Sequence, residues 1–330
     1  MNAAIFIITQ NTEARRVYLK TTLYFLFKNF NAEYKYPVII FHEGDYTLEH
    51  QREILLGIRA SCRACVTFRA VDEGDFDYPE WIDAAKVQRS VDLQVTPYWR
   101  NEGYRKMCRW WVVCMPKYAA AYDYVMRVDD DSIIEEPVGD LFEWMQKKDI
   151  VYASNMLHID CALCCYGMKD FFLERFPDQE AILDKMFIEQ KLPSRAGQLF
   201  PFRSLLSMLY QDNLPEISDS ITLTAPIMFY NNFFITKSDF WQRPDVQKVI
   251  HDIDKNGSMF YIRWGDAPIH TLITTLIGGK EKTSRAMFKY SKRMQREAFI
   301  DDKKECQCYL PSEYTDTTCI TQRKSVSESL

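Results

Sequence analysis

The 330-residue sequence has no excess of basic residues and no long run of apolar ones. Its 46 acidic residues outnumber 41 basic residues, and this balance argues against a nucleic-acid partner, since such proteins favour basic surfaces. No stretch reaches the roughly 18 apolar residues of a transmembrane helix. The segment from Met1 to Ile8 is too short for a signal peptide and lacks its basic flank, so we expect a first strand there.

Ten cysteines are present, and two CxxC spacings, Cys62–Cys65 and Cys161–Cys164, raise the question of a zinc site. The two pairs lie far apart in the chain, and neither has the context of a zinc ribbon. Buried thiols or a few disulfides are therefore favoured over zinc.

Apolar runs alternate with amphipathic segments along much of the chain. We expect strands over Ala3–Thr9, Pro37–His42, Cys65–Phe68, Tyr122–Val128, Ile150–Ser154 and Pro226–Ile235. We expect helices after the N-cap Thr12 and over Leu48–Ile58, Tyr104–Tyr122, Val138–Lys147 and Pro244–Lys255. Such alternation predicts an α/β fold with a mostly parallel central sheet flanked by helices. A ligand then binds outside the carboxyl ends of the strands.

Three consecutive acids, Asp129 to Asp131, follow the apolar run that ends at Val128. A turn can aim Asp129 and Asp131, which are two residues apart, at one ion, and hard carboxylate oxygens suit Mg²⁺ or Mn²⁺. Such an ion commonly neutralises the diphosphate of a nucleotide substrate. The alternative is an Asp-rich turn with no role beyond capping the next element.

Two further groups of polar residues are candidates for a site. Arg105 and Arg109 share one face of the predicted helix, either as solvated charges or close to a phosphate. In the segment Arg263–His270 (RWGDAPIH), Asp266 can cap a helix that Pro268 begins, with a buried His270 one turn on. Asp266 can equally act as a base or stabilise positive charge, and His270 can contact a phosphate or a metal.

Four ordered segments resemble glycosyltransferase family 15, the fungal-type α-1,2-mannosyltransferases. They are Tyr78–Asp83 (YPEWID), Tyr104–Trp110, Tyr122–Asp131 and Arg263–His270. The resemblance covers roughly Ile5–Ile277 and is weakest over residues 160–223.

The resemblance implies a GT-A-type nucleotide-sugar transferase fold. The implied reaction moves mannose from GDP-mannose to a hydroxyl of a glycan or glycoprotein acceptor with retention, and depends on Mn²⁺, with Mg²⁺ as the other candidate ion. Asp129 and Asp131 match the metal-binding acids, and Asp266 matches an active-site carboxylate. We further predict donor contacts from Tyr104, Arg105, Arg109, Arg127 and Asp130, and substrate contacts from Asn232, Trp264 and His270.

This sequence departs from the family pattern at two positions. Phe234 stands where the family has a glutamate that is its candidate nucleophile, and a phenyl ring cannot form a glycosyl-enzyme. The reaction then uses a same-side substitution without a covalent intermediate, or Asp266 serves instead, or activity is lost. A histidine that is a candidate metal ligand in the family is also missing from Lys289–Lys292, so metal binding must depend more on the acids.

We expect one catalytic domain over residues 1–280, with a helical insertion at 160–223 on the acceptor side. A charged extension, 281–330, follows, and its last residues are expected to be disordered. Alternatives are a transferase for another nucleotide-sugar and a catalytically weakened nucleotide-sugar-binding protein. A metal-dependent phosphoesterase would want more ligands near the acids. The resemblance suggests the Golgi lumen, whereas the missing signal and anchor leave a soluble cytoplasmic enzyme open.

Overall fold

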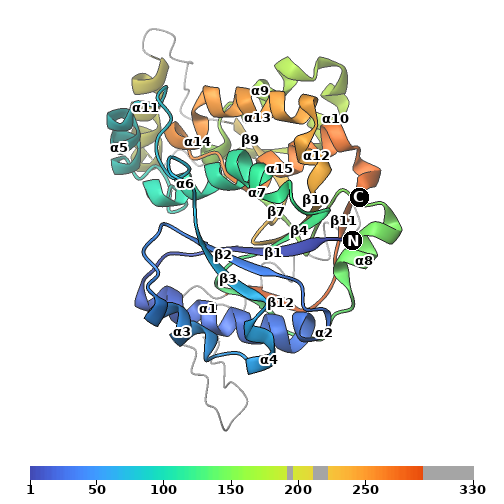
Figure 1. The fold of residues 1–330 in the computed structure, drawn as a ribbon. Helices are drawn as coiled ribbons and strands as arrows, with labels where there is room; N and C mark the ends of the chain where they lie inside the picture. The colour runs from blue at the N-terminus through green and yellow to red at the C-terminus, as the bar shows by residue number, and fades with distance from the viewer. Residues whose placement is uncertain (192–195, 211–221, 293–330) are drawn as a thin grey trace.

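The computed structural model describes residues 1–191, 196–210 and 222–292 (Figure 1). Most of the predicted charged extension, including the residues expected to be disordered, therefore lies outside the described residues. The same holds for three of the ten cysteines, Cys306, Cys308 and Cys319.

A seven-stranded sheet forms the centre of the fold, in the order β11-β6-β10-β4-β1-β2-β3. Its strands are β11 (Thr283–Arg285), β6 (Tyr152–Ser154), β10 (Phe233–Lys237), β4 (Tyr124–Val128), β1 (Ala3–Ile8), β2 (Val38–His42) and β3 (Val66–Ala70). Neighbouring strands are parallel except at β10, which runs antiparallel to both β4 and β6. The predicted mostly parallel sheet is confirmed.

The strand order reverses between β1 and β4. From β1 the chain adds β2 and β3 on one side, and then returns to place β4 on the other. In open α/β sheets ligands bind at such a reversal, beyond the carboxyl ends of the strands. Thr9 follows β1 at this point and Asp129 follows β4, so this topology brings the acidic turn against the start of the first helix.

Helices cover both faces of the sheet (Figure 1). One face carries α1 (Glu13–Leu26), η1 (Phe27–Asn31), α2 (Ala32–Tyr34), α3 (Leu48–Leu55), α4 (Ala60–Arg63) and α8 (Leu141–Lys148). The other carries α5 (Ala84–Asp92), α6 (Glu102–Arg109), α7 (Met115–Ala119), α9 (Met168–Arg175), α10 (Glu180–Met186), α11 (Ala196–Tyr210), α12 (Ser238–Gln242), α13 (Pro244–Asn256), α14 (Ser258–Tyr261) and α15 (Asp266–Ile273). Short turns extend or join these helices: η2 (Trp110–Cys114), η3 (Ala162–Cys165), η4 (Pro177–Gln179), η6 (Thr274–Gly278) and η7 (Lys280–Lys282).

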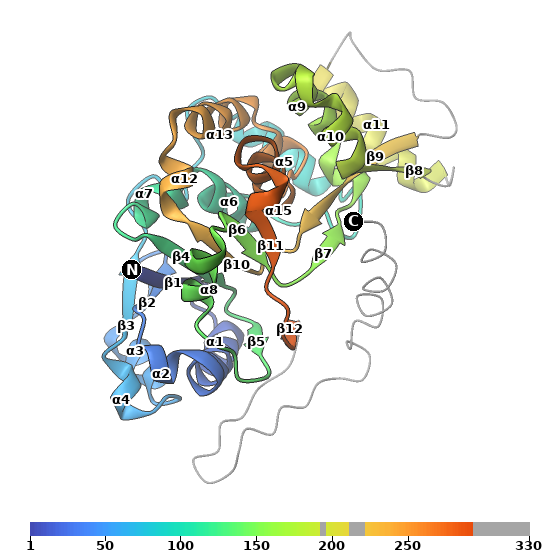
Figure 2. The same cartoon turned by 90° about the vertical axis from the view of Figure 1, so that its right-hand side faces the viewer.

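Two smaller antiparallel sheets complete the fold. Strand β5 (Ser132–Ile134) pairs with β12 (Tyr290–Lys292), and the two lie side by side below the central sheet in Figure 2. The other small sheet has the order β7-β9-β8, with β7 (Leu157–Ile159), β9 (Thr222–Phe229) and β8 (Phe187–Lys191). Strand β8 lies in the region 160–223, where the sequence predicts only short helices.

The single strand predicted over Pro226–Ile235 is wrong. The chain turns at residues 230–232 and divides this apolar run between β9 and β10, which belong to different sheets. The two asparagines Asn231 and Asn232 occupy the turn, and asparagine is among the residues that favour turns. This division places both asparagines beside the acidic turn, since the N–H of Asp129 donates to the carbonyl of Asn232 at 2.9 Å.

The helix predicted over Tyr104–Tyr122 runs instead from Glu102 to Ala119, with a wider π turn in the middle. There the N–H of Met115 donates to the carbonyl of Trp110, five residues back. Pro116 follows immediately and has no N–H of its own, and proline crowds the preceding turn of a regular α-helix. The π turn provides space for that ring without ending the helix.

Within the described ranges, no helix has the length and apolar character needed to cross a membrane. The seven cysteines in these ranges are all free thiols, as one of the two expectations had it; five are buried, and Cys65 and Cys161 are half-buried. No group of three or more histidine, cysteine, aspartate or glutamate side chains in the described residues is arranged to hold a metal.

Candidate functional site

The acidic turn connects β4 to β5 at the reversal of strand order. The N–H of Ser132 donates to the carbonyl of Asp129 at 3.1 Å and closes the turn. All three carboxylates lie mostly below the surface, where burial favours their neutral forms unless a cation compensates. The partners of each acid therefore decide what the turn can do.

Asp130 points toward the first helix. Its carboxylate accepts hydrogen bonds from Thr9 at 2.6 Å and from Arg15 Nη1 at 2.8 Å. Its backbone carbonyl accepts one from the Thr22 hydroxyl at 2.9 Å. Burial raises the pKa of Asp130, and the Arg15 charge opposes that rise. Asp130 thus joins the turn to β1 and α1.

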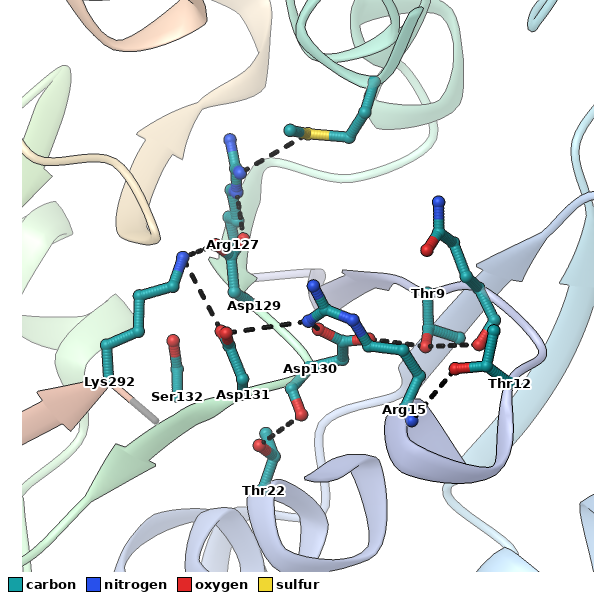
Figure 3. A network of polar contacts seen from close by, with 12 residues as sticks. Thr9, Thr12, Arg15, Thr22, Arg127, Asp129, Asp130, Asp131, Ser132 and Lys292 are labelled. Carbon is teal, nitrogen blue, oxygen red and sulfur yellow. Dashed lines mark hydrogen bonds and ion pairs between the residues drawn. The ribbon is translucent and has the colours of Figure 1, made fainter. Parts of the chain in front are cut away.

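Asp129 and Asp131 share a cation from the end of the described chain (Figure 3). The Lys292 ammonium lies 2.9 Å from Asp129 Oδ2 and 3.6 Å from Asp131 Oδ1. On its other side, Asp131 lies 3.6 Å from Arg15 Nη1. Burial acts to raise the pKa of Asp129, but the charges of Arg127 and Lys292 outweigh burial and hold that pKa below its usual range.

Arg127 joins the acidic turn to Asp266, at the start of α15. Its Nε donates to Asp129 at 2.7 Å and its Nη1 to the Asp266 carboxylate. Asn231 Nδ2 donates to the same Asp266 oxygen at 2.8 Å. Burial acts to raise the pKa of Asp266, but the Arg127 charge outweighs burial and the pKa is lowered. Asp266 is thus held as a carboxylate in a buried position.

Asp266 is the first residue of α15 and does not cap that helix, so the cap predicted from the sequence is wrong. Gly265 holds the N-cap position, and no side-chain cap is present there. The Asp266 carboxylate instead bonds to Arg127 and Asn231, and a charge-assisted bond to a buried arginine is stronger than a capping bond from a backbone N–H. This diversion from capping supports a role for Asp266 in the site.

The donor set at the turn does not fit a divalent cation. Asp129 and Asp131, the two predicted ligands, are bridged by an ammonium that would have to leave before a metal could bind. Asp131 Oδ1 makes no hydrogen bond, but the Lys292 charge faces it. With two carboxylates as its protein ligands, a manganese or magnesium ion would take its remaining ligands from water or a phosphate, so the bridging ammonium is the main obstacle to a metal here.

The structure gives Arg105 and Arg109 protein partners away from the acids. Arg109 forms a bidentate pair with Asp254 at 2.8 and 2.9 Å. Arg105 is fully buried and donates to the Phe260 carbonyl, to Ser90 Oγ at 3.0 Å and to the Trp99 carbonyl at 3.2 Å. These contacts explain both residues as supports of the fold, and donor contacts from them stay a prediction.

Tyr104 lies closer to the network. Its hydroxyl faces Arg263 Nη1 at 3.5 Å, and Arg263 in turn pairs with Asp160 at 2.9 Å. Met107, one turn further along the same helix, accepts a contact from Arg127 Nη2 at 3.7 Å. Helix α6 therefore faces the Arg127 side of the site through Tyr104 and Met107 rather than through its arginines.

The three predicted substrate contacts differ in their surroundings. The His270 ring is fully buried, with Nε2 3.1 Å from the Trp111 carbonyl, and burial lowers its pKa to about 4. The Trp264 indole is also buried and donates to the Tyr166 carbonyl at 2.9 Å. The Trp264 indole is fully partnered, whereas His270 Nδ1 is buried without a hydrogen-bond partner. Both polar atoms of the buried Asn232 amide also lack a hydrogen-bond partner within the described residues, which makes Asn232 the stronger candidate for a ligand contact.

Phe234 is part of the core beneath the site. It lies directly opposite Arg127 in the β10–β4 pairing, and its ring is fully buried. The ring packs against Trp111 at 5.7 Å and Tyr152 at 5.2 Å between centroids. The position at which the family resemblance leads us to expect a carboxylate is therefore filled by an aromatic ring, and Asp266 is the acid that Arg127 holds here.

The residues of the site that were missed from the sequence include Thr9, Arg15, Asn231 and Lys292. Thr9 and Arg15 could have been found, because they follow the first strand and parallel strands end at one edge of a sheet. No local pattern identifies Lys292, which depends on the pairing of β12 with β5.

A sequence model of one family, glycolipid 2-alpha-mannosyltransferase, matches residues 1–190 and 205–328 of the chain. The glycolipid 2-alpha-mannosyltransferase of Saccharomyces cerevisiae is 23% identical over 269 residues, covering 80% of this chain and 54% of that protein. Glycolipid 2-alpha-mannosyltransferase 1 of Candida albicans is 25% identical, covering 77% of this chain and 54% of that protein. The chain thus spans about half the length of these curated relatives.

Two solved structures share the fold. Core-mannan synthase A from Aspergillus fumigatus, in its Mn/GDP form, has a TM-score of 0.66 at 20% identity, covering 88% of this chain and 74% of that one. The mannosyltransferase Ktr4p from S. cerevisiae, in complex with GDP, has a TM-score of 0.68 at 18% identity, covering 95% and 77%. The predicted GT-A-type fold is confirmed by this likeness.

Proposed function

Because the chain belongs to the glycolipid 2-alpha-mannosyltransferase family, we propose that it transfers mannose from GDP-mannose to a hydroxyl of a glycan or glycoprotein acceptor, with retention. The linkage we favour is α-1,2, and the acceptors we favour are glycans of the secretory pathway.

One observation carries the proposal: the network that joins Asp129 through Arg127 to Asp266 across the carboxyl end of β4. It unites two segments that are far apart in the sequence, at the point where an α/β sheet binds its ligand. The unpartnered amide of Asn232 and the cations Arg15 and Lys292 lie around the same turn. Groups of both signs are thus available for a sugar and a diphosphate.

The residues of the chain have separate tasks in this reaction. Cationic groups stabilise the departing GDP as the bond from the anomeric carbon to the phosphate oxygen breaks and its electron pair leaves with that oxygen. The ionised Asp266 carboxylate stabilises the positive charge that develops on the sugar. The acceptor hydroxyl forms its bond on the same face, and its proton passes to the departing phosphate oxygen. The proposed step forms no covalent glycosyl-enzyme: Phe234 has no nucleophilic atom, and the Asp266 carboxylate accepts hydrogen bonds from Arg127 and Asn231.

The predicted Mn²⁺ has no step in this proposal. Core-mannan synthase A has been solved with manganese and GDP, and that is a property of the relative. In this chain the predicted ligands Asp129 and Asp131 face Lys292, so a divalent cofactor stays a prediction that the donor set does not favour.

A nucleotide-sugar-binding protein with weakened catalysis is the second candidate. The buried phenyl ring of Phe234 favours it, because that ring stands where the family resemblance leads us to expect an acid. The two candidates share the donor site and differ only in turnover.

Purified protein incubated with GDP-mannose and an α-mannoside separates the two candidates. We expect GDP release together with an acceptor heavier by one hexose, detected by mass spectrometry, and no product with a UDP-sugar. GDP binding without product supports the second candidate. Product from a UDP-sugar alone contradicts the assigned donor.

Asp266→Asn tests the carboxylate, with Asp254→Asn as the matched control. Both acids are buried and paired with an arginine, but Asp254 pairs with Arg109 away from the acidic turn. We expect transfer to fall by at least tenfold, on the order of the loss of one electrostatic contact to the transition state, in Asp266→Asn only. Equal losses at a temperature where both variants are folded contradict a catalytic role for Asp266.

A further inference from the structure

We propose that the Lys292 ammonium is the built-in cation of the acidic turn, and that Lys292 and Arg15 hold the donor's diphosphate without a divalent metal ion. This inference rests on the proposed function for the identity of the diphosphate. The part that concerns the cation of the turn depends on this chain's own residues.

Lys292 lies where a metal shared by the two predicted ligands would have to sit. Its ammonium bridges Asp129, at 2.9 Å, and Asp131, at 3.6 Å (Figure 3). Within the described parts of the chain, no third acid, histidine or cysteine joins these carboxylates to form a metal-binding group. A divalent ion would therefore have few protein ligands and would face a like charge at contact distance.

The backbone fixes this lysine in place. In the antiparallel pair of β12 with β5, Lys292 lies directly opposite Ser132, the residue after the acidic turn. Two pairs further along, Tyr290 lies opposite Ile134, and its hydroxyl donates to Ser132 Oγ at 2.6 Å. The Tyr290 ring also packs on Phe233, with the centroids 5.7 Å apart. The register of a strand pair thus determines which side chain reaches the acids.

The accessible parts of the cluster are its cations. The side chains of Lys292 and Arg15 are 26% and 38% exposed, whereas those of Asp129 and Asp131 are 15% and 6% exposed. An ammonium has three donor hydrogens, and the carboxylates do not use all of them. Oxygens of a diphosphate approaching from solvent therefore meet Lys292 and Arg15 before they meet the acids, and form charge-assisted hydrogen bonds.

Direct titration with MnCl₂ tests the built-in cation without any nucleotide. Electron paramagnetic resonance of free Mn²⁺ reports how much metal the protein binds. We expect no site in the wild type, and a new site in Lys292→His, where a neutral ligand replaces the ammonium beside the two acids. Adding Asp131→Asn to Lys292→His should abolish that site. Wild-type binding of Mn²⁺ that Asp131→Asn removes overturns the proposal.

Calorimetric titration with GDP tests the diphosphate contact. In the wild type, affinity should be the same in EDTA and in MnCl₂, and Lys292→Met should weaken it about tenfold, as for one lost charge-assisted hydrogen bond. Lys289→Met is the matched control, because this exposed lysine lies three residues earlier and loses the same charge. GDP binding that requires Mn²⁺, or equal losses in Lys292→Met and Lys289→Met, overturns the contact.

The two titrations separate this inference from the proposed function. A wild type that binds neither Mn²⁺ nor GDP contradicts a GDP-dependent transferase and the diphosphate contact, while the built-in cation stands. A wild type that binds GDP only with Mn²⁺ and transfers mannose contradicts the inference and leaves the proposed function intact. Thermal unfolding of each variant confirms that a lost site does not reflect a lost fold.

Discussion

Replacing Phe234 by alanine separates the packing of this ring from any part in catalysis. The ring is fully buried and lies within 5.7 Å, between centroids, of Trp111, Tyr152 and His270. Removing a buried phenyl group loses its transfer free energy and leaves a cavity, at a cost of about 3–5 kcal/mol. The three neighbouring rings are rigid and close the space poorly, so we expect a cost of about 4 kcal/mol or more.

The cost translates into a modest change of melting temperature. An unfolding entropy of about 2.1 cal/mol/K per residue gives roughly 0.7 kcal/mol/K for a chain of this length, so about 4 kcal/mol corresponds to about 6 °C. Scanning calorimetry measures the shift, and release of GDP from GDP-mannose measures transfer at a temperature well below both transitions. Phe234→Leu, which keeps most of the volume, should lie between the wild type and Phe234→Ala in stability.

The reasoning fails if a folded Phe234→Ala protein has no transfer at all while Phe234→Leu is fully active. The ring would then contribute to the chemistry or to the alignment of Arg127, which lies opposite it on β4. An unchanged melting temperature would contradict the packing argument instead. Transfer that survives in proportion to the folded fraction supports a reaction without a nucleophile at this position.

Three further perturbations test separate parts of the structure. Arg109→Met leaves the buried Asp254 carboxylate without its partner, and should lower the free energy of unfolding, measured in urea, by about 3–5 kcal/mol. Calorimetry should show no change in the affinity of the variant for GDP. Burial lowers the pKa of His270 in the folded protein from 6.5 to about 4, so below pH 6.5 the unfolded chain binds a proton that the folded chain does not. The free energy of unfolding should therefore fall by about 3 kcal/mol between pH 7 and pH 4 in the wild type, and by less in His270→Gln. Gly257→Ala should lower the melting temperature, because a Cβ there lies 2.8 Å from the Tyr261 ring and the φ of 74° costs an L-residue about 1–2 kcal/mol.

The sequence predicts the parallel part of the sheet because buried parallel strands are continuous apolar runs, as in Ala3–Ile8 and Tyr124–Val128. It predicts the start of α1 because Thr12 has the chemistry of an N-cap, and its side chain accepts from the N–H of Arg15. These features depend on neighbours in the sequence. The apolar run over Pro226–Ile235 fails as a guide, because a buried run does not reveal which of two sheets each half joins.

The site follows the same division between local and distant contacts. The position of the acids after β4 is a local property, and it was predicted. The bond of Asp266 to Arg127 and the approach of Lys292 to Asp129 join residues more than a hundred positions apart, and helix or strand periodicity carries no information on them. The resemblance to a family supplied Asp266, but Lys292 lies where this chain departs from that family.

The pairing of β12 with β5 sets an order on the assembly of the site during synthesis. Arg15 and the three acids emerge from the ribosome long before Lys292, so an unfinished chain holds the acidic turn without one of its cations. Until β12 docks, Asp129 and Asp131 repel each other with less compensation, and the turn should open easily. The folding of this centre is thus tied to the last described strand, and a chain cut just before Tyr290 should keep its sheet but lose an ordered acidic turn.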